Sequence, residues 1–191
     1  MASDIWLVRH GPTEWSESGR HTGRTDLPLT DAGRAAAAAL APVLAGHEFD
    51  LVLTSPKSRA LETARLAGFD ECVVVPDLSE WDYGDFEGLT TAEIRVRGAE
   101  WADWTVWRGP LPNGETVEEV GERAERVIAR VEAAVGDVLV FGHGHQLRIL
   151  GAVAVGLGAG AGARLAFDPT RISVIGPEHE SRVLRTWNGC P

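Results

Sequence analysis

Cysteine is scarce in this 191-residue chain, which contains only Cys72 and Cys190. Two cysteines are too few for the disulfide framework that holds many small secreted proteins together. A reducing compartment is the simplest environment for such a chain. We therefore expect a cytoplasmic location.

Long hydrophobic runs are also missing. The most apolar stretch is residues 149–163, but glycine interrupts it throughout, whereas a membrane-spanning helix needs about 18 apolar residues in succession. A signal peptide would need a cationic start and a long apolar core, and Asp4, Arg9 and His10 stand in its place. We expect neither membrane insertion nor export.

Positive charge is too sparse for a broad basic surface, because the net charge is -10 and the isoelectric point is about 5.0. Nucleic acids and anionic membranes need such a surface, so neither is expected as a partner. A small anionic substrate in a local basic pocket remains compatible with these values. The oligomeric state is left open, a homo-oligomer included.

Strand and helix patterns alternate along the chain. Continuous apolar runs favour strands buried on both faces of a parallel sheet, and they occur at residues 5–8, 51–53 and 138–141. Good helix formers or helical spacing of apolar residues predict helices over residues 32–46, 57–68 and 115–136. Ser55 is expected to cap the second of these helices, and a closing strand pair is expected within 164–189. The alternation predicts an α/β fold, a three-layer sandwich with a mostly parallel central sheet and helices on both faces.

Polar residues follow the expected strands at the edge where ligands of α/β sheets bind. Arg9 and His10 follow the first strand, Arg59 comes shortly after the second, and His143 follows the third. Arginine grips phosphate oxygens with a planar, permanently charged fork. Backbone N–H groups near Gly144 can approach an anion closely, because glycine has no side chain in the way. The pattern indicates a phosphate-binding site.

Histidine is the nucleophile that remains after other phosphate chemistries are excluded. The sequence has neither a GxxxxGK[ST] loop nor a cysteine in a CxxxxxR setting. A neutral imidazole can attack phosphorus, and neighbouring cations would lower the pKa of His10 and keep it neutral. A leaving alkoxide needs a proton from a nearby acid. The candidate acids are Asp77, Glu80, Asp82, Asp85 and Glu87.

A metal site is an alternative at the same positions. His143 and His145 have the spacing of an H-x-H metal pair, and with His10 and an aspartate, Asp26, they would suggest a zinc hydrolase. Arginines in the same pocket would repel a cation, so we expect neither a metal nor another cofactor. For Arg59 the alternative is a solvated ion pair with a glutamate one helical turn on.

Four motifs together resemble the histidine phosphatase superfamily, whose fold is phosphoglycerate-mutase-like: LVRHG (7–11), TSPKSRALETA (54–64), SEWDYGDFEG (79–88) and FGHGHQLR (141–148). They stand in the family's order and span nearly the whole chain. The resemblance implies that His10 is the phosphorylated nucleophile and Glu80 the proton donor. Arg9, Arg59 and His143 would complete the phosphate pocket.

The residues expected to bind substrate are Ser16, Arg20, Thr22, Gly23, Arg24, Gly144 and His145. The resemblance implies this role for the segment around Thr22 and Gly23, where family members contact the substrate. A structural role is an equally good interpretation of His145. Arg20, His21 and Arg24 are equally compatible with positions in an exposed loop that does not contact substrate.

Residues 1–191 are expected to form a single domain. Residues 82–115 do not fit the alternation of strands and helices and are expected to form a helical excursion over the active site. Its tryptophans at every third position form either a helical face packed on the body or a lid that stacks on substrate; they are Trp101, Trp104 and Trp107.

Two features favour the phosphatase branch of the family over the mutases. Mutases resemble a version of this chain with an insertion that carries paired arginines, whereas residues 101–116 hold a lone Arg108. Residues 13–30 resemble the acid phosphatases and sugar-bisphosphate phosphatases. We expect a metal-independent histidine acid phosphatase that hydrolyses small phosphomonoesters, phosphorylated sugars or related metabolites, through a phosphohistidine.

Two other functions remain open. The nearer is a phosphoglycerate mutase. The other is a non-catalytic domain with a regulatory role or one that binds a phosphorylated ligand. Such a domain would need the arginines to bind phosphate, but it would not need the acid Glu80.

Overall fold

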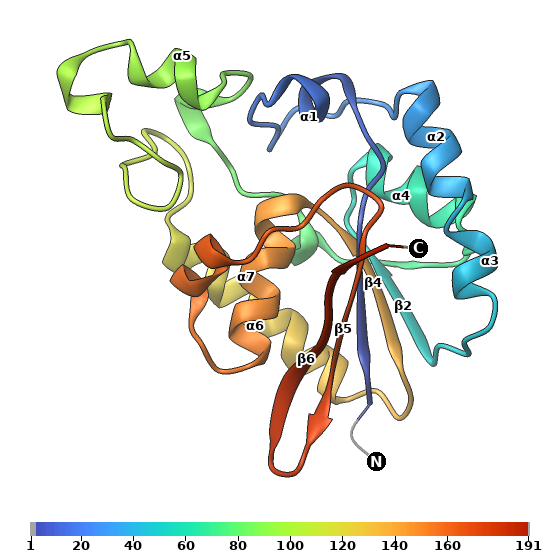
Figure 1. Ribbon diagram of the computed structural model, residues 1–191. Helices are drawn as coiled ribbons and strands as arrows, with labels where there is room; N and C mark the ends of the chain where they lie inside the picture. The colour runs from blue at the N-terminus through green and yellow to red at the C-terminus, as the bar shows by residue number, and fades with distance from the viewer. Residues whose placement is uncertain (1–2, 191) are drawn as a thin grey trace.

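A six-stranded sheet forms the centre of the protein, in the order β3-β2-β4-β1-β5-β6 (Figure 1). The computed structural model describes residues 3–190. The parallel strands are β1 (Ile5–Arg9), β2 (Leu51–Thr54), β3 (Val73–Val74) and β4 (Val138–Gly142). The closing strands, each antiparallel to the one before it in the sheet, are β5 (Ile172–Glu178) and β6 (Ser181–Gly189). All except the two-residue β3 overlap a predicted segment.

Helices cover both faces of the sheet, which confirms the predicted α/β fold (Figure 1). One face carries α6 (Val117–Glu132) and α7 (Gly144–Ala154), and the other carries α2 (Asp31–Ala38), α3 (Ala41–Leu44) and α4 (Ser58–Leu66). The shorter elements are α1 (Glu14–Ser18), η1 (Pro76–Leu78), η2 (Gly84–Phe86), α5 (Thr91–Arg95), η3 (Ala99–Trp101) and η4 (Ala159–Arg164). Within residues 3–190, none of the helices has both the length and the apolar character that crossing a bilayer requires.

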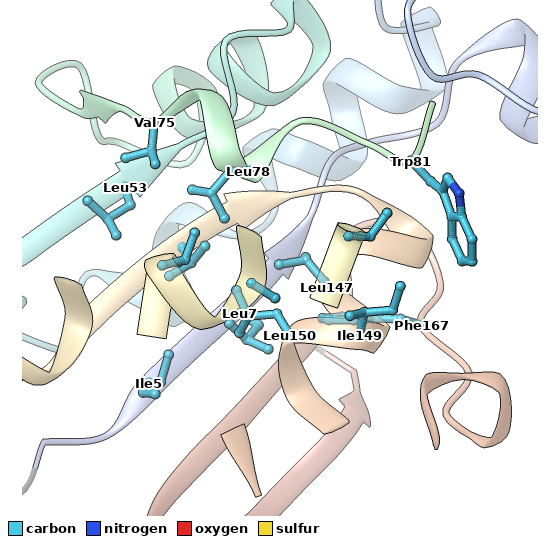
Figure 2. Close-up of a cluster of buried hydrophobic side chains, with 14 of the residues drawn as sticks. Ile5, Leu7, Leu53, Val75, Leu78, Trp81, Leu147, Ile149, Leu150 and Phe167 are labelled. Carbon is cyan, nitrogen blue, oxygen red and sulfur yellow. The ribbon is translucent and has the colours of Figure 1, made fainter. Parts of the chain in front are cut away.

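Side chains of the strands alternate between two apolar clusters. Figure 2 shows the cluster under α6 and α7, where Leu7 of β1 packs with Leu147 and Leu150. The next residue of β1, Val8, belongs to the cluster on the opposite face, together with Phe141 of β4. Burial on both faces explains why these strands read as unbroken apolar runs. Each fully buried aliphatic side chain contributes about 1.5–3 kcal/mol to folding.

Two details of the predicted helices are wrong. The helix expected over 32–46 is broken into α2 and α3, because Pro42 has no N–H to donate to Ala38 and its ring would clash with that carbonyl. Ser55 does not cap α4, which begins at Ser58 after an extended Lys57. The Ser55 side chain is fully buried instead and contacts the site at the strand ends.

Residues 82–115 consist of short helices and turns rather than one helix, because glycines and prolines interrupt the segment. The three tryptophans therefore do not share a helical face. Trp104 is buried against Phe86, with ring centroids 5.2 Å apart, and Trp107 lies 5.3 Å from the ring of Trp81. They pack into the body of the protein without forming a helical stripe.

Candidate active site

The carboxyl ends of β1 and β4, neighbours in the sheet, bring two buried histidines together. His10 follows β1 and His143 follows β4, and their ring centroids are 5.1 Å apart. The backbone N–H of His10 donates to the carbonyl of Gly142 at 3.0 Å, which continues the strand pairing into the site. Arg59 lies in the first turn of α4, the helix that follows β2, and β2 neighbours β4 on the side away from β1. Its side chain contacts His143. The three strand ends thus meet at one point.

The hydrogen bond of His10 defines which of its ring nitrogens is free. Nδ1 lies 2.7 Å from the carbonyl oxygen of Gly11. A carbonyl only accepts, so Nδ1 carries the proton and Nε2 of the neutral ring holds a lone pair. Burial, followed by the charges of Arg59 and Arg9, holds the pKa of His10 well below its ordinary 6.5. The ring is therefore neutral and nucleophilic at neutral pH.

His143 has the opposite tautomer. Arg59 Nε donates to its Nδ1 at 3.2 Å, so Nε2 carries the proton and donates to the Ser55 hydroxyl at 2.7 Å. Burial, followed by the charges of Arg59 and His10, lowers the pKa of His143 well below 6.5. The side chain is held by two hydrogen bonds in a neutral state.

The two arginines of the site are anchored to backbone carbonyls. Arg59 is fully buried and donates to the carbonyls of Thr25 and Thr22 at 3.0 and 3.1 Å. Arg9 donates to the carbonyl of Phe167 at 2.6 Å, and its buried Nε has no partner among residues 3–190. A Cβ at Gly144 would lie 3.1 Å from the Arg9 guanidinium carbon, so glycine there leaves room for Arg9. Both arginines have N–H groups left for an anion.

Glu80 caps α7 from outside the helix. Its Oε1 accepts from the backbone N–H groups of Gln146 and Trp81, both at 2.9 Å, and its Oε2 accepts from that of His145 at 3.1 Å. His143, the N-cap residue, provides no side-chain cap of its own. The carboxylate therefore satisfies the free donors at the positive end of α7.

A cavity of about 170 Å³ opens at this point. The predicted residues that line it are Arg9, His10, Ser16, Arg20, His21, Thr22, Glu80, Gly144 and His145. Arg59 and His143 are fully buried behind this lining. The cavity is suited to a small ligand whose phosphate lies against His10 and Arg9.

A model of the histidine phosphatase superfamily (branch 1) matches residues 5–189. The chain belongs to this superfamily. An acid phosphatase of Mycobacterium tuberculosis is 42% identical over 184 residues, which cover 94% of this chain and 89% of the relative. A sedoheptulose 1,7-bisphosphatase of Saccharomyces cerevisiae is 40% identical over 177 residues, 77% of this chain and 65% of the relative.

A solved structure supports the same assignment. The structure of an open reading frame from Mycobacterium tuberculosis matches with a TM-score of 0.91 and 40% identity, over 98% of this chain and 97% of that chain. The fold is that of the phosphoglycerate-mutase-like proteins, as the resemblance implied. The chain is a phosphatase enzyme.

Two predicted substrate residues of this histidine phosphatase do not reach the cavity. The backbone N–H of Gly23 donates to the Glu87 carboxylate at 3.0 Å, and a Cβ at Gly23 would lie 2.3 Å from the Trp81 carbonyl oxygen. The side chain of Arg24 is 72% exposed and pairs with Asp82. Gly23 is thus needed for close packing, while Arg24 lies on the surface.

Among the candidate acids, only Glu80 lines the cavity. The other carboxylates are engaged elsewhere: Asp77 with Arg126, Asp82 with Arg24, Asp85 with Asn113, and Glu87 with the backbone of Gly23 and Thr25. Of these carboxylates, Glu80 is therefore the one placed to meet a ligand in the cavity.

Several residues of the cavity wall were not predicted, namely Thr13, Gly19, Tyr83, Arg148 and Phe167. One of them had a usable signal: Arg148 stands four residues after Gly144, and such residues share one face of a helix. Its guanidinium lies 4.7 Å from the ring centroid of Trp107 and donates to the carbonyls of Gly162 and Ala163. Arg148 has no carboxylate partner within residues 3–190.

The zinc alternative does not fit the geometry. Both ring nitrogens of His143 already have partners, and Nδ1 of His145 lies 2.7 Å from the Tyr83 hydroxyl. Across residues 3–190, no three side chains of the ligating types cluster in a way that would hold a metal ion. These histidines are arranged as parts of a hydrogen-bonded site.

Buried histidines should make the free energy of unfolding depend on pH. The pKa values of His10, His143 and His145 lie well below 6.5, and burial lowers that of His21 to about 4. Well above pH 6.5 both states are neutral and these groups have no effect. Below it the unfolded chain binds protons that the folded chain does not, so stability falls, by up to about 1.4 kcal/mol per pH unit for each histidine.

Urea unfolding between pH 7 and pH 5 measures this effect. We expect stability to decrease steadily over that range, and His21→Gln to reduce the slope by about one proton. A stability that is constant between pH 7 and 5 would contradict the neutral, buried state of these rings.

Proposed function

We propose that this histidine phosphatase hydrolyses small phosphomonoesters through a phosphohistidine at His10. The observation that carries the proposal is the hydrogen bond from His10 Nδ1 to the Gly11 carbonyl, which leaves the Nε2 lone pair free in a cavity shared with Arg9 and Glu80. Without that lone pair the ring could bind a phosphate but could not attack it.

The reaction has two steps. In the first, Nε2 of His10 forms a bond to phosphorus, the P–O bond to the alcohol breaks, and Glu80 gives its proton to the leaving oxygen. Arg9 and Arg59 stabilise the charge on the phosphoryl oxygens, and His143, whose ring nitrogens are bonded to Arg59 and Ser55, holds the Arg59 guanidinium beside them. In the second, Glu80 takes a proton from water, the water oxygen bonds to phosphorus, and the N–P bond breaks to release phosphate.

The substrate is proposed to be a phosphorylated sugar or a related metabolite. The cavity is small, and Arg148 adds a cation without a carboxylate partner to its wall. Such a cation favours a substrate that carries a second negative group. The sugar bisphosphate named for the yeast relative has that charge. Sugar bisphosphates are therefore the first substrates to assay.

A panel of phosphoesters, assayed for released phosphate with and without EDTA, tests the proposal. Fructose 1,6-bisphosphate, sedoheptulose 1,7-bisphosphate, β-glycerol phosphate and 3-phosphoglycerate are suitable members. We expect turnover that EDTA leaves unchanged and that is faster at acidic than at alkaline pH, because Glu80 must carry a proton in the first step.

Each rival function gives a different outcome. Strong inhibition by EDTA would favour a metal enzyme, and conversion of 3-phosphoglycerate to its 2-isomer would favour a mutase. The mutase is disfavoured because Arg108 is exposed and lines another cavity. Binding of these esters without turnover would favour a non-catalytic domain.

We further propose that residues 1–191 act as one catalytic domain in the cytoplasm, with residues 82–115 covering the substrate end of the site. Tyr83, which lies in the cavity wall, supports the position of residues 82–115. The two cysteines, neither of them in a disulfide, support the cytoplasmic location. A homo-oligomer is compatible with them.

A further inference from the structure

Arg123 of α6 is an arginine buried outside the cavity, with 6% of its surface exposed. Its Nη1 donates to the backbone carbonyls of Asp77 at 2.8 Å and Ser79 at 2.6 Å. Its Nε and Nη2 donate to the two carboxylate oxygens of Glu115 at 2.9 and 3.1 Å. The guanidinium therefore ties η1, the segment immediately before Glu80, to α6.

Glu115 holds the chain on the other side of Glu80. Its Oε2 accepts from the backbone N–H of Asp82 at 2.9 Å, and its own N–H donates to the Asp82 carbonyl at 3.0 Å. Its carbonyl accepts from the indole N–H of Trp81 at 2.8 Å. The bonds of one Glu–Arg pair thus reach the backbone both before and after position 80.

We propose that Glu115 and Arg123 are positioning residues for the proton donor Glu80, an inference that rests on the donor role proposed above. Neither of them lines the cavity that contains His10, so neither contacts the reacting phosphate there. Their bonds set where the backbone at position 80 lies relative to α7, and that distance determines whether the Glu80 carboxylate reaches the cavity. A displacement of about 1 Å in a catalytic group can cost on the order of 100-fold in rate.

The chemistry of the pair supports positioning over simple stabilisation. Arg123 is buried and Glu115 half-buried, and an ion pair in either setting gains little net stability, because desolvation or solvent screening offsets the attraction of the charges. The planar guanidinium, in contrast, directs several hydrogen bonds in fixed directions. Because the pair bonds to the backbone both before and after Glu80, it restrains the position of that residue from both sides.

The dependence on the leaving group separates positioning from general damage. An alkoxide leaves β-glycerol phosphate only with a proton from the acid, whereas p-nitrophenolate leaves p-nitrophenyl phosphate without one. In single-turnover phosphorylation of the enzyme, we expect Arg123→Met and Glu115→Gln to slow the first substrate 10- to 100-fold and the second less than threefold. Arg123→Lys should give a smaller loss of the same kind.

Arg126 provides a matched control on the same helix. Its Nη2 and Nε bind the Asp77 carboxylate at 2.7 and 3.1 Å, so it links α6 to the same η1 segment but bonds to no backbone beside Glu80. Arg126→Met should leave both substrates unchanged.

Glu80→Gln distinguishes failure of this inference from failure of the proposed function. If Glu80→Gln slows both substrates equally, Glu80 is not the proton donor. If it slows β-glycerol phosphate selectively while Glu115→Gln and Arg123→Lys slow both substrates equally or neither, the positioning role is wrong. Should Arg123→Met fail to fold by circular dichroism, these two milder variants decide the question.

Discussion

Replacing His10 by alanine is expected to lower kcat/KM by a factor on the order of 10⁴ or more, because no other side chain in the cavity presents a neutral nitrogen lone pair at this position. Within residues 3–190 its side chain forms a hydrogen bond only to Gly11, so the fold should survive the change. Released phosphate measures the activity, and circular dichroism and urea unfolding measure the fold.

His47→Ala is the matched control for this prediction. His47 is exposed and its ring packs on Trp6, away from the cavity. The control should keep full activity and should still form an acid-labile phosphoenzyme, which His10→Ala should not. Turnover by folded His10→Ala within tenfold of the unaltered protein would refute the phosphohistidine mechanism.

Replacing Arg59 by methionine is expected to reduce both activity and stability. The change removes a phosphate-binding fork, which should lower kcat/KM by about 10³-fold. It also leaves His143 Nδ1 and the carbonyls of Thr22 and Thr25 without their donor. Unsatisfied buried acceptors are costly, so the free energy of unfolding should fall by about 3 kcal/mol.

Arg65→Met controls for the loss of an arginine from α4, because Arg65 is exposed in the last turn of the same helix. Steady-state kinetics and urea unfolding of both variants provide the comparison. An Arg59→Met variant as active as Arg65→Met would show that Arg59 does not act on the phosphate.

The meeting of His10 and His143 could be predicted because it depends on strand order and local sequence. Buried parallel strands read as apolar runs, and the carboxyl ends of such strands meet at one edge of the sheet. His10 and His143 follow two of these strands, so their approach required only the correct sheet. Glu80 was selected by resemblance, since nothing local distinguishes it from Asp82 or Glu87.

The part of the cavity wall that Phe167 forms could not be predicted, because tertiary packing decides it. Phe167 reaches the site from the loop before β5, and Arg9 bonds to its carbonyl across a large sequence separation. Gly23 has the sequence context of a substrate contact, yet close packing against Trp81 explains it. The role of Ser55 could not be predicted for a similar reason. A serine before a proline has the sequence pattern of a helix cap, and only the fold shows that Ser55 bonds to His143 instead.

The capping of α7 by Glu80 gives this residue a structural role that would persist if catalysis were lost during evolution. Mutations that damage folding are removed by selection even when catalysis no longer matters. A descendant that had lost turnover and kept only phosphate binding would still be selected to retain Glu80, because three backbone N–H groups depend on it. A non-catalytic domain would therefore still have a structural use for this acid. His10 has no comparable structural role. Loss of His10, and not of Glu80, is therefore the change expected in a relative of this enzyme that has lost catalysis.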